Sequence, residues 1–251
     1  MRYFIYLSYD GSGYCGWQIQ PGSPSVQQTI ENAFSLFMRQ NIRVTGAGRT
    51  DTGVHARTMV AHFDLDNPAD TLWMTSKLNC ILPDDIAIQR IVPVAPSAHA
   101  RFDATSRTYR YYVSLVKTPF AAKYSWQLSV KPDFELMNQA AKILLDTSDF
   151  TSFSKLHTDT KTNNCRVIEA DWEERGQGLW VFTITADRFL RNMVRAIVGT
   201  LLDVGRHKLT IADFTEIVNG LDRCLAGDSA PAHGLFLEGI TYPEIIFNTT
   251  I

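Results

Sequence analysis

Strand-like and helix-like patterns alternate along the whole chain, and no segment recurs at a fixed period. Residues 1–9 are rich in aromatic and β-branched side chains, which is typical of a strand. Apolar residues then recur at helical spacing from Val26 to Phe37, directly after Ser25, a residue type that often caps helices. Because both periods occur without a repeat, the pattern predicts a mixed α+β fold.

The proline-flanked stretch 93–96 separates two sets of such elements. A chain of 251 residues suffices for one large domain or two small ones, so we expect an N-terminal half at 1–103 and a C-terminal half at 104–251. The remaining strands are expected at 42–45, 57–65, 86–92, 106–116, 165–174 and 179–186, and the remaining helices at 72–81, 134–145, 190–204 and 211–220.

The composition is that of an ordinary globular chain, with 45% apolar and 20% charged residues. The cysteines form no C-x-x-C pair and the histidines show no H-x-x-x-H spacing, so we expect neither disulfides nor a metal site. The first apolar run is too short for a signal peptide and no run suffices for a membrane span, so a soluble, cytoplasmic protein is expected. The net charge of -2 by itself favours neither nucleic acid nor a membrane as a partner.

A G-x-G-x-x-G pattern at residues 11–16 follows the first strand and is formally that of a dinucleotide site. In such sites the third glycine opens a helix that holds a pyrophosphate. Here the helical pattern begins only after Ser25, so a nicotinamide enzyme is disfavoured. Two other interpretations stay open: a glycine turn with Trp17 packed against the body, or a close approach of a phosphate backbone with Tyr14 and Trp17 as stacking faces.

The loop at residues 46–55 is denser in chemistry, because three glycines flank a single carboxylate, Asp51. Arg49 lies two residues before it and His55 four residues after it. A carboxylate in a glycine-rich loop between strands is positioned by the backbone, as catalytic groups often are, whereas the plainer interpretation is an Asx-turn. Arginines favour the catalytic interpretation, because they would keep a partly buried carboxylate ionised.

Arginines also gather in two other places. Arg188, Arg191 and Arg195 are spaced so that a helix would hold them within about 60° on one face, although a solvated charged face is the commoner outcome. Residues 101–112 interleave arginines with Phe102 and three tyrosines. That mixture can hold phosphates and unstacked bases, although tyrosine-rich strands more often belong to a core.

Residues 48–56 read GRTDTGVHA, which resembles the GRTDAGVHA active-site loop of TruA-type tRNA pseudouridine synthases, with Thr52 in place of the usual alanine. The resemblance extends over nearly the whole chain in the family's order. Its other blocks are YDGSGYCGWQIQ at 9–20, ARF at 100–102, RTYRY at 107–111, FLRNMVR at 189–195, AP at 230–231 and GL at 234–235.

The resemblance implies a role for each matched residue. Asp51 would be the essential nucleophile, and Arg49 would assist entry of a flipped uridine. Tyr109 would contact the target base, Arg195 would pair with Asp51, and Leu235 would pack near the pocket. Further RNA contacts are expected from Arg107, Arg110, Arg188, Arg191, Trp17 and Gln18.

The resemblance also implies two ferredoxin-like halves whose antiparallel sheets meet at a central basic cleft, and a homodimer that grips one tRNA. It implies no cofactor and no metal. The substrate would be uridine at positions 38–40 of the anticodon stem-loop, flipped out of its stack and isomerised to pseudouridine. The carboxylate could attack C6 or C1′ or remove a ribose proton, and these routes stay open.

Two other classes of protein remain as alternatives: a tRNA-binding module without chemistry, which would use the same clusters, and the dinucleotide enzyme. The charge pattern favours nucleic acid more than the net charge does. Segments 1–57, 101–131 and 188–210 carry +2, +5 and +4, whereas the three segments between and after them carry -3, -5 and -5. The positive segments hold Asp51, Tyr109 and Arg195, which predicts a focused basic site.

Overall fold

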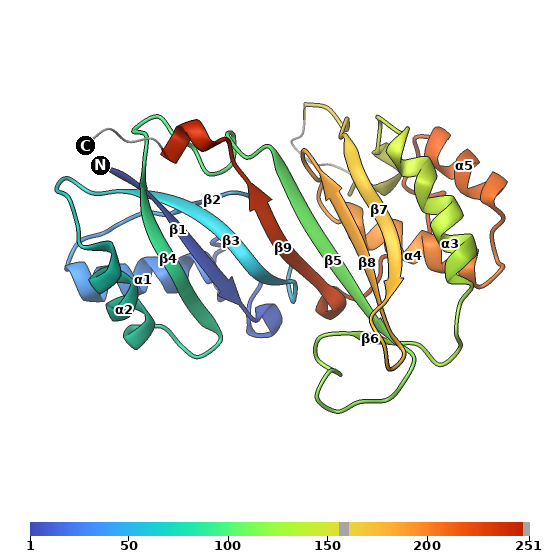
Figure 1. Cartoon of the computed structure of the whole chain (residues 1–251), viewed down its shortest axis with the longest axis horizontal. Helices are drawn as coiled ribbons and strands as arrows, with labels where there is room; N and C mark the ends of the chain where they lie inside the picture. Colours follow the sequence, from blue (N-terminus) through green and yellow to red (C-terminus); the bar gives the residue numbers. More distant parts are fainter. Residues whose placement is uncertain (156–160, 248–251) are drawn as a thin grey trace. The chain divides into compact units, whose positions relative to one another are not determined.

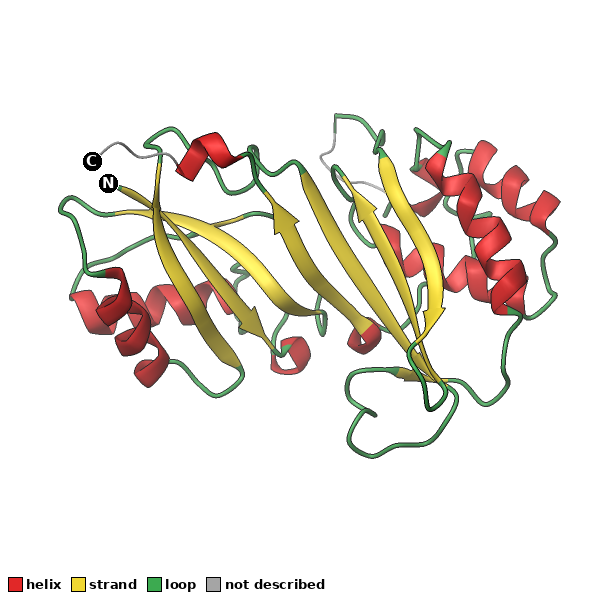
Figure 2. Cartoon of the chain, in the orientation of Figure 1, coloured by secondary structure: helices red, strands yellow, loops and turns green. Residues whose placement is uncertain are grey.

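The computed structural model describes residues 1–155 and 161–247, and the chain forms two compact units. Unit 1 comprises Met1–Ser106 and Leu237–Ile251, and unit 2 comprises Arg107–Phe236. Each unit combines antiparallel strands with helices (Figures 1 and 2), which confirms the predicted α+β class. The first unit boundary lies close to the expected division after residue 103, but the end of the chain groups with unit 1.

Unit 1 is built on antiparallel strands. Its elements are β1 (Arg2–Tyr9), α1 (Val26–Met38), β2 (Thr45–Gly46), β3 (His55–Asp64), α2 (Thr71–Ile81) and β4 (Ile86–Val94). The strand order is β4–β1–β3, and the short β2 pairs with β3. Helices α1 and α2 cover one face of these strands (Figure 1). The strand expected at 42–45 was only partly correct, because Thr45 is its only residue that belongs to β2 and pairs with β3.

An aromatic cluster holds α1 against this sheet. Ser25 caps the helix as predicted, because its side chain accepts a hydrogen bond from the Gln28 N–H at 3.3 Å. Phe34 of α1 lies 4.8 Å, ring centre to ring centre, from Phe63 of β3, and Phe63 lies 5.5 Å from Tyr3 of β1. All three rings are buried, so the helix is fixed to the two strands next to the glycine-rich loop.

The last described residues belong to unit 1 because hydrogen bonds and a ring contact join them to it. β9 (Leu235–Thr241) begins in unit 2 and ends in unit 1. The Thr105 N–H donates to the Thr241 carbonyl oxygen at 2.9 Å, and the Tyr242 hydroxyl donates to the Ala100 carbonyl oxygen at 2.6 Å. The ring of Tyr242 also packs edge-on against Phe4 of β1, at 5.0 Å.

Unit 2 has the strand order β5–β8–β7, with a short parallel strand added beside β5. Its elements are β5 (Ser106–Ser114), β6 (Trp126–Gln127), α3 (Phe134–Ala141), β7 (Val167–Glu174), β8 (Leu179–Ala186), α4 (Met193–Gly205) and α5 (Ile211–Asn219). The helices gather on one side of β7 and β8 (Figure 1). Phe134 of α3 stacks on Trp180 of β8 at 3.7 Å, which fixes the first helix to the sheet.

Most predicted elements occur within a few residues of their expected bounds, but two predictions were incomplete. The helix expected at 190–204 begins only at Met193, and the helix expected at 134–145 ends at Ala141 and continues as a 3₁₀ turn, Lys142–Leu145. β6 and β9 were not predicted at all. Within residues 1–155 and 161–247, none of the helices combines the length and the apolarity that a bilayer span needs.

Candidate active site

The loop that carries Asp51 connects β2 to β3 in unit 1. The Ala47 N–H donates to the Val60 carbonyl oxygen at 2.8 Å, so the first residue after β2 is still hydrogen-bonded to β3. Its tip is a tight turn in which the Val54 N–H donates to the Asp51 carbonyl oxygen at 3.1 Å, and Gly53 has a φ of 76°. A glycine is favoured there because other residues strain in this left-handed region. Asp51 is therefore partly exposed on a turn whose backbone is fixed.

The segment that follows β1 packs against this loop and holds it. The hydroxyls of Tyr9 and Thr50 lie 2.8 Å apart in a buried hydrogen bond, one residue before Asp51. On the other side of Asp51, the Gly53 N–H donates to the Tyr14 carbonyl oxygen at 3.3 Å. Two residues from far earlier in the chain thus hold the loop on both sides of the carboxylate: Tyr9 bonds the Thr50 side chain and Tyr14 bonds the Gly53 backbone.

His55, the first residue of β3, is anchored to the same segment. Its side chain is only 1% exposed. Its Nδ1 atom lies 3.1 Å from the backbone nitrogen of Gly11 and 3.0 Å from a carboxylate oxygen of Asp10. One ring nitrogen cannot accept from Gly11 and donate to Asp10 at once, so the presence or absence of a proton on Nδ1 decides which of these two hydrogen bonds forms.

The glycines of the G-x-G-x-x-G pattern allow this close packing. A Cβ on Gly11 would lie 2.0 Å from the Val54 carbonyl oxygen, and a Cβ on Gly16 would lie 2.2 Å from the Thr50 carbonyl oxygen. Gly16 is followed by irregular chain, and the next α-helix begins at Val26. The dinucleotide interpretation therefore fails, because no helix N-terminus follows the third glycine.

The interpretation of Trp17 as a base-stacking face is not supported. Its side chain is 2% exposed, and its indole lies so close to Gly46 that a Cβ there would meet the indole Nε1 atom at 2.4 Å. Tyr14 is buried as well, and its hydroxyl donates to Asp85 at 2.7 Å. Burial and this carboxylate together raise the pKa of Tyr14. The alternative interpretation, a glycine turn with Trp17 packed against the body, fits these contacts.

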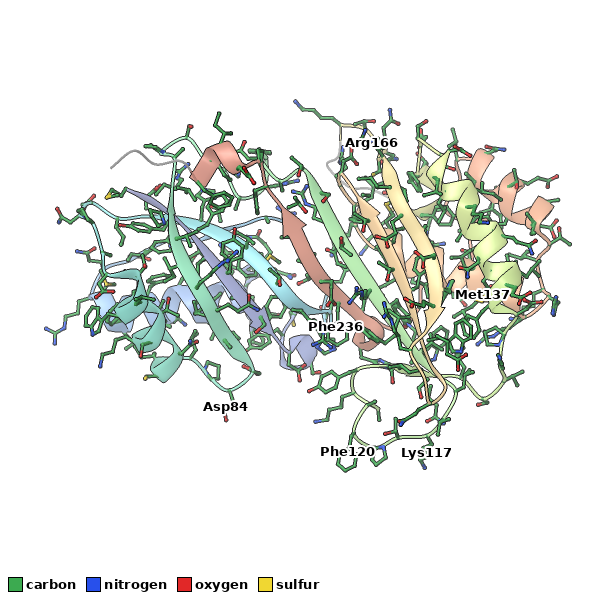
Figure 3. The ribbon with its side chains drawn as sticks, viewed as in Figure 1. Asp84, Lys117, Phe120, Met137, Arg166 and Phe236 are labelled. Carbon is green, nitrogen blue, oxygen red and sulfur yellow. The ribbon has the colours of Figure 1, made fainter. Side chains whose placement is uncertain are left out.

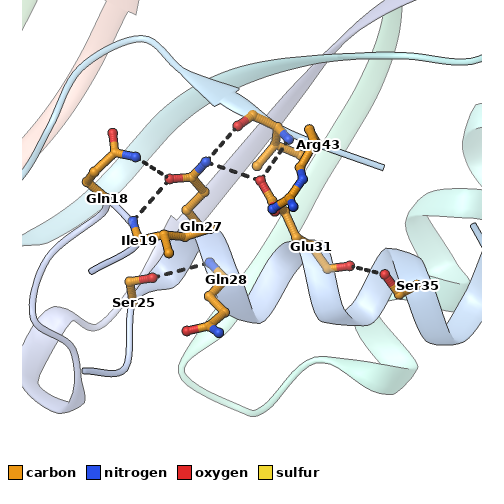
Figure 4. Close-up of polar contacts among 9 residues, drawn as sticks. Gln18, Ile19, Ser25, Gln27, Gln28, Glu31, Ser35 and Arg43 are labelled. Atoms are coloured by element: carbon orange, nitrogen blue, oxygen red, sulfur yellow. Dashed lines mark hydrogen bonds and ion pairs between the residues drawn. The ribbon is translucent and has the colours of Figure 1, made fainter. Parts of the chain in front are cut away.

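Gln18 takes part in a chain of polar contacts that ends at α1 (Figure 4). Its side-chain amide donates to the Oε1 atom of Gln27 at 2.9 Å, and Gln27 donates to Glu31 at 3.1 Å. Glu31 is buried and is neutralised by Arg43 at 2.7 Å, two residues before β2. This network ties the segment after Trp17 to the chain that leads into the Asp51 loop. An RNA contact by Gln18 stays a prediction.

In unit 2, strand β5 contains the RTYRY block and places Tyr109 and Tyr111 on one face. Tyr109 is partly exposed, and its ring lies edge-on to Phe189 at 5.0 Å. Tyr111 is fully buried, its hydroxyl donates to the Pro231 carbonyl oxygen at 2.8 Å, and burial raises its pKa. The cluster at residues 101–112 therefore fits both of its interpretations in part. Tyr111 belongs to the core, and Tyr109 is partly exposed, as a base-contacting residue must be.

Arg195 lies in the first turn of α4 and is held by the segment before β9. Its Nε atom donates to the Ala230 carbonyl oxygen at 2.7 Å, and the Ala230 N–H donates back to the Arg195 carbonyl oxygen at 2.9 Å. Gly234 packs against the Tyr111 ring, since a Cβ there would meet it at 2.8 Å, and Leu235 follows, 5% exposed. Tyr109, Tyr111, Arg195 and Leu235 thus all belong to unit 2, and the segment 230–234 contacts both Tyr111 and Arg195.

The predicted row of three arginines on one helix face is wrong. Asn192 takes a left-handed conformation with a φ of 67°, and its side chain donates to Ser229 at 2.6 Å instead of capping the helix. α4 therefore begins at Met193, and Arg188 and Arg191 lie on the irregular segment before it. Only one of the three, Arg195, is a helical residue.

The other predicted residues are placed as follows. Arg49 is exposed on the Asp51 loop. Arg107 on β5 donates from Nη1 to the Asp187 carbonyl oxygen at 2.7 Å, and Arg110, opposite Thr183 of β8, is partly buried. Asp51 and Arg49 belong to unit 1 whereas Tyr109 and Arg195 belong to unit 2, so the pairing of Asp51 with Arg195 stays a prediction. Within residues 1–155 and 161–247, no cluster of three or more His, Cys, Asp or Glu side chains could hold a metal ion.

Sequence reasoning missed the residues that support the loop. Tyr9, Gly11 and Gly16 contact the Asp51 loop through their backbone or a single hydroxyl. The glycine pattern after the first strand was the sequence signal for this packing. The residues that pack against those glycines lie about forty positions further along the chain, so the signal did not show what it contacts. His55 was noted only as a neighbour of Asp51, and its anchoring role depends on Asp10 and Gly11.

Comparisons with known proteins identify the family of this chain. A family model described as tRNA pseudouridine synthase matches residues 5–103 and 140–243. The curated protein named tRNA pseudouridine synthase A from Parabacteroides distasonis is 58% identical over 247 residues, which cover 98% of each chain. Proteins of the same name from Porphyromonas gingivalis and Bacillus subtilis are 59% and 40% identical, over 98% and 96% of this chain and 99% of theirs. The chain therefore belongs to the tRNA pseudouridine synthase family, whose members are isomerases that act on uridine in tRNA.

Proposed function

We propose that this chain converts uridine to pseudouridine at positions 38–40 of the tRNA anticodon stem-loop, with Asp51 as the nucleophile. The observation that carries the proposal is the fixed position of a partly exposed carboxylate on a glycine turn. Hydrogen bonds hold the residues on both sides of Asp51, at Thr50 and at Gly53. Such preorganisation is what a group needs if it is to attack the same atom in every turnover.

The reaction breaks the bond between C1′ and N1, turns the uracil ring and joins C1′ to C5, while C5 loses its proton and N1 takes one up. Asp51 would attack C1′ and displace N1, or add to C6, and its bond to the substrate would break as or after C5 bonds to C1′. The target nucleotide would first leave its stack, at a cost of a few kcal/mol. Tyr109, partly exposed on β5, would contact the flipped base, and its hydroxyl would move the C5 proton. Leu235 would close the apolar side of the pocket.

Two arginines would assist the carboxylate. Arg195 would pair with Asp51 and keep it deprotonated, and the bond from its Nε atom to Ala230 already orients its guanidinium. Arg49, exposed on the loop, would guide the uridine into the site. A Lys in place of Arg195 would retain the charge but lose the bidentate geometry.

The finer architecture is part of the same proposal. Two ferredoxin-like halves, at 1–103 and 104–251, would meet at a basic cleft, and two copies of the chain would hold one tRNA in the cytoplasm. Arg107, Arg110, Arg188, Arg191 and Gln18 would contact RNA. Mass in solution with and without tRNA tests the dimer.

The test of the mechanism is tritium release from tRNA that contains 5-tritiated uridine. Asp51→Asn keeps the shape of the side chain and removes its charge, so we expect release to stop while tRNA binding stays close to that of the wild type. Asp66→Asn is the matched control, because Asp66 is an exposed carboxylate of the same unit outside the loop. If Asp51→Asn releases tritium as fast as Asp66→Asn, Asp51 is not the nucleophile.

A further inference from the structure

The loop between β5 and β6, residues 115–125, exposes an aromatic ring at its outer end. Phe120 is 92% exposed, the largest value among the exposed large apolar side chains of the described residues. Lys117 and Lys123, three residues before and after it, are also exposed. Figure 3 shows Lys117 and Phe120 pointing away from the strands of unit 2. A single exposed ring is ordinary, but a ring between two lysines combines a stacking face with two phosphate contacts.

The loop is held in a defined shape. The Tyr124 N–H and the Ser125 hydroxyl both donate to the Ala121 carbonyl oxygen, at 2.9 and 3.0 Å, which closes a turn just after Phe120. The ring of Tyr124 packs 6.2 Å from that of Phe236, the residue next to Leu235. The exposed ring is therefore presented by a closed loop, so binding through it loses less conformational entropy than ordering a free segment would.

The charge around this loop has one sign. From Arg107 to Pro132, unit 2 contains five basic residues and no acidic one, and no other segment of unit 2 without an acidic residue is as long. The five basic residues are Arg107, Arg110, Lys117, Lys123 and Lys131. A protein surface that served a second copy of this slightly acidic chain would gain from mixed charges, whereas a polyanion is attracted by cations alone.

The position of the loop on β5 relates it to the proposed site. Tyr109 lies five residues before Ser114, where β5 ends and the loop begins. At about 3.3 Å per residue, the two points are about 17 Å apart along the strand. An RNA whose target base reaches Tyr109 would need to extend only about 17 Å along β5 to reach the loop.

We propose that the 115–125 loop is a second contact for the tRNA, in which Phe120 stacks on an unpaired base and Lys117 and Lys123 bind the flanking phosphates. The inference rests on the proposed function, since it takes Tyr109 as the place of the target base. The family model matches residues 5–103 and 140–243, so the match itself says nothing about this loop.

The test is the equilibrium binding of a tRNA transcript, measured with steady-state kinetics of tritium release. Phe120→Ala raises the Kd at least about fivefold and raises KM with it, while kcat at saturating tRNA stays unchanged. Lys117→Ala with Lys123→Ala lowers the slope of log affinity against log salt by about one for each lysine. Leu72→Ala, which removes an 83% exposed apolar side chain from α2, is the matched control and leaves the Kd unchanged.

A Kd for Phe120→Ala equal to that of Leu72→Ala would overturn the proposal. The proposal would also be overturned if Phe120→Ala lowered the molecular mass of the assembly in solution while its tRNA affinity stayed unchanged. The loop would then be a contact between copies of the chain. The proposed function is tested separately by tritium release from the wild type. A wild type that releases no tritium but binds tRNA through Phe120 would refute the proposed function and keep the loop contact.

Discussion

Gly16→Ala tests whether the segment after β1 positions the loop that carries Asp51. An alanine Cβ at this position would lie 2.2 Å from the Thr50 carbonyl oxygen and 3.1 Å from the carbonyl carbon of Asp51. Backbone atoms cannot rotate away, so the loop must retreat by about 1 Å to restore ordinary contact. A displacement of about 1 Å at a reacting group costs about 100-fold in rate. We therefore expect kcat to fall about 100-fold.

Gly16→Ala also lowers the free energy of unfolding for a second reason, which is independent of the contact with Thr50. Gly16 has a φ of 87°, and a residue with a side chain loses about 1–2 kcal/mol in this left-handed region. Gly22→Ala separates the two effects, because Gly22 has a φ of 70° in the same segment but no atom within 4 Å of the place that an added Cβ would take. Both variants should lose stability in urea unfolding, and only Gly16→Ala should lose activity.

The assay is single-turnover tritium release with enzyme in excess over tRNA, which reports the chemical step. Binding of the transcript, measured alongside, shows whether the loss lies in the rate or in the affinity. The reasoning is refuted if Gly16→Ala, folded and bound to tRNA, reacts as fast as Gly22→Ala. The loop would then tolerate a shift of its backbone, and the packing of the segment against it would be structural only.

Three further predictions follow from single side chains. Tyr9→Phe leaves the buried Thr50 hydroxyl without its partner, so urea unfolding should show a loss of about 1–2 kcal/mol and tritium release a lower kcat. Burial, with His99 and Arg2 nearby, lowers the pKa of His62 to about 4. The unfolded chain therefore takes up this proton first, and stability should fall by at most about 3 kcal/mol between pH 6.5 and 4, a loss that urea titrations should not find in His62→Gln. Thr52→Ala alters an exposed side chain and should change kcat/KM less than about twofold.

Local chemistry allowed much of the fold to be predicted. The cap at Ser25 and the apolar spacing after it placed the start of α1, and the aromatic run at residues 2–9 placed β1. Prediction failed where a distant contact decides the backbone. Asn192 turns left-handed while its side chain reaches Ser229, thirty-seven residues away, and no local pattern indicates that α4 must wait for Met193.

The site divides in the same way. The glycine loop with Asp51 stood out because its residue types are unusual between two strands, and the structure places it there, between β2 and β3. The role of Gly11 and Gly16 was hidden because the atoms that exclude a side chain belong to Val54 and Thr50. A glycine pattern indicates that something comes close, and only the fold shows whether that is a ligand or another part of the chain.

The grouping of charge explains how a chain with a net charge of -2 can act on a polyanion. Residues 101–131 carry +5 and residues 188–210 carry +4, whereas residues 132–187 and 211–251 carry -5 each. At physiological salt, interactions between exposed charges are largely screened beyond about 8 Å, so a phosphate responds to the nearest side chains and hardly to the total. Binding should therefore weaken steeply with salt despite the acidic balance. The acidic segments repel RNA that approaches them, so a net charge that by itself favours no partner is compatible with RNA binding at the basic segments.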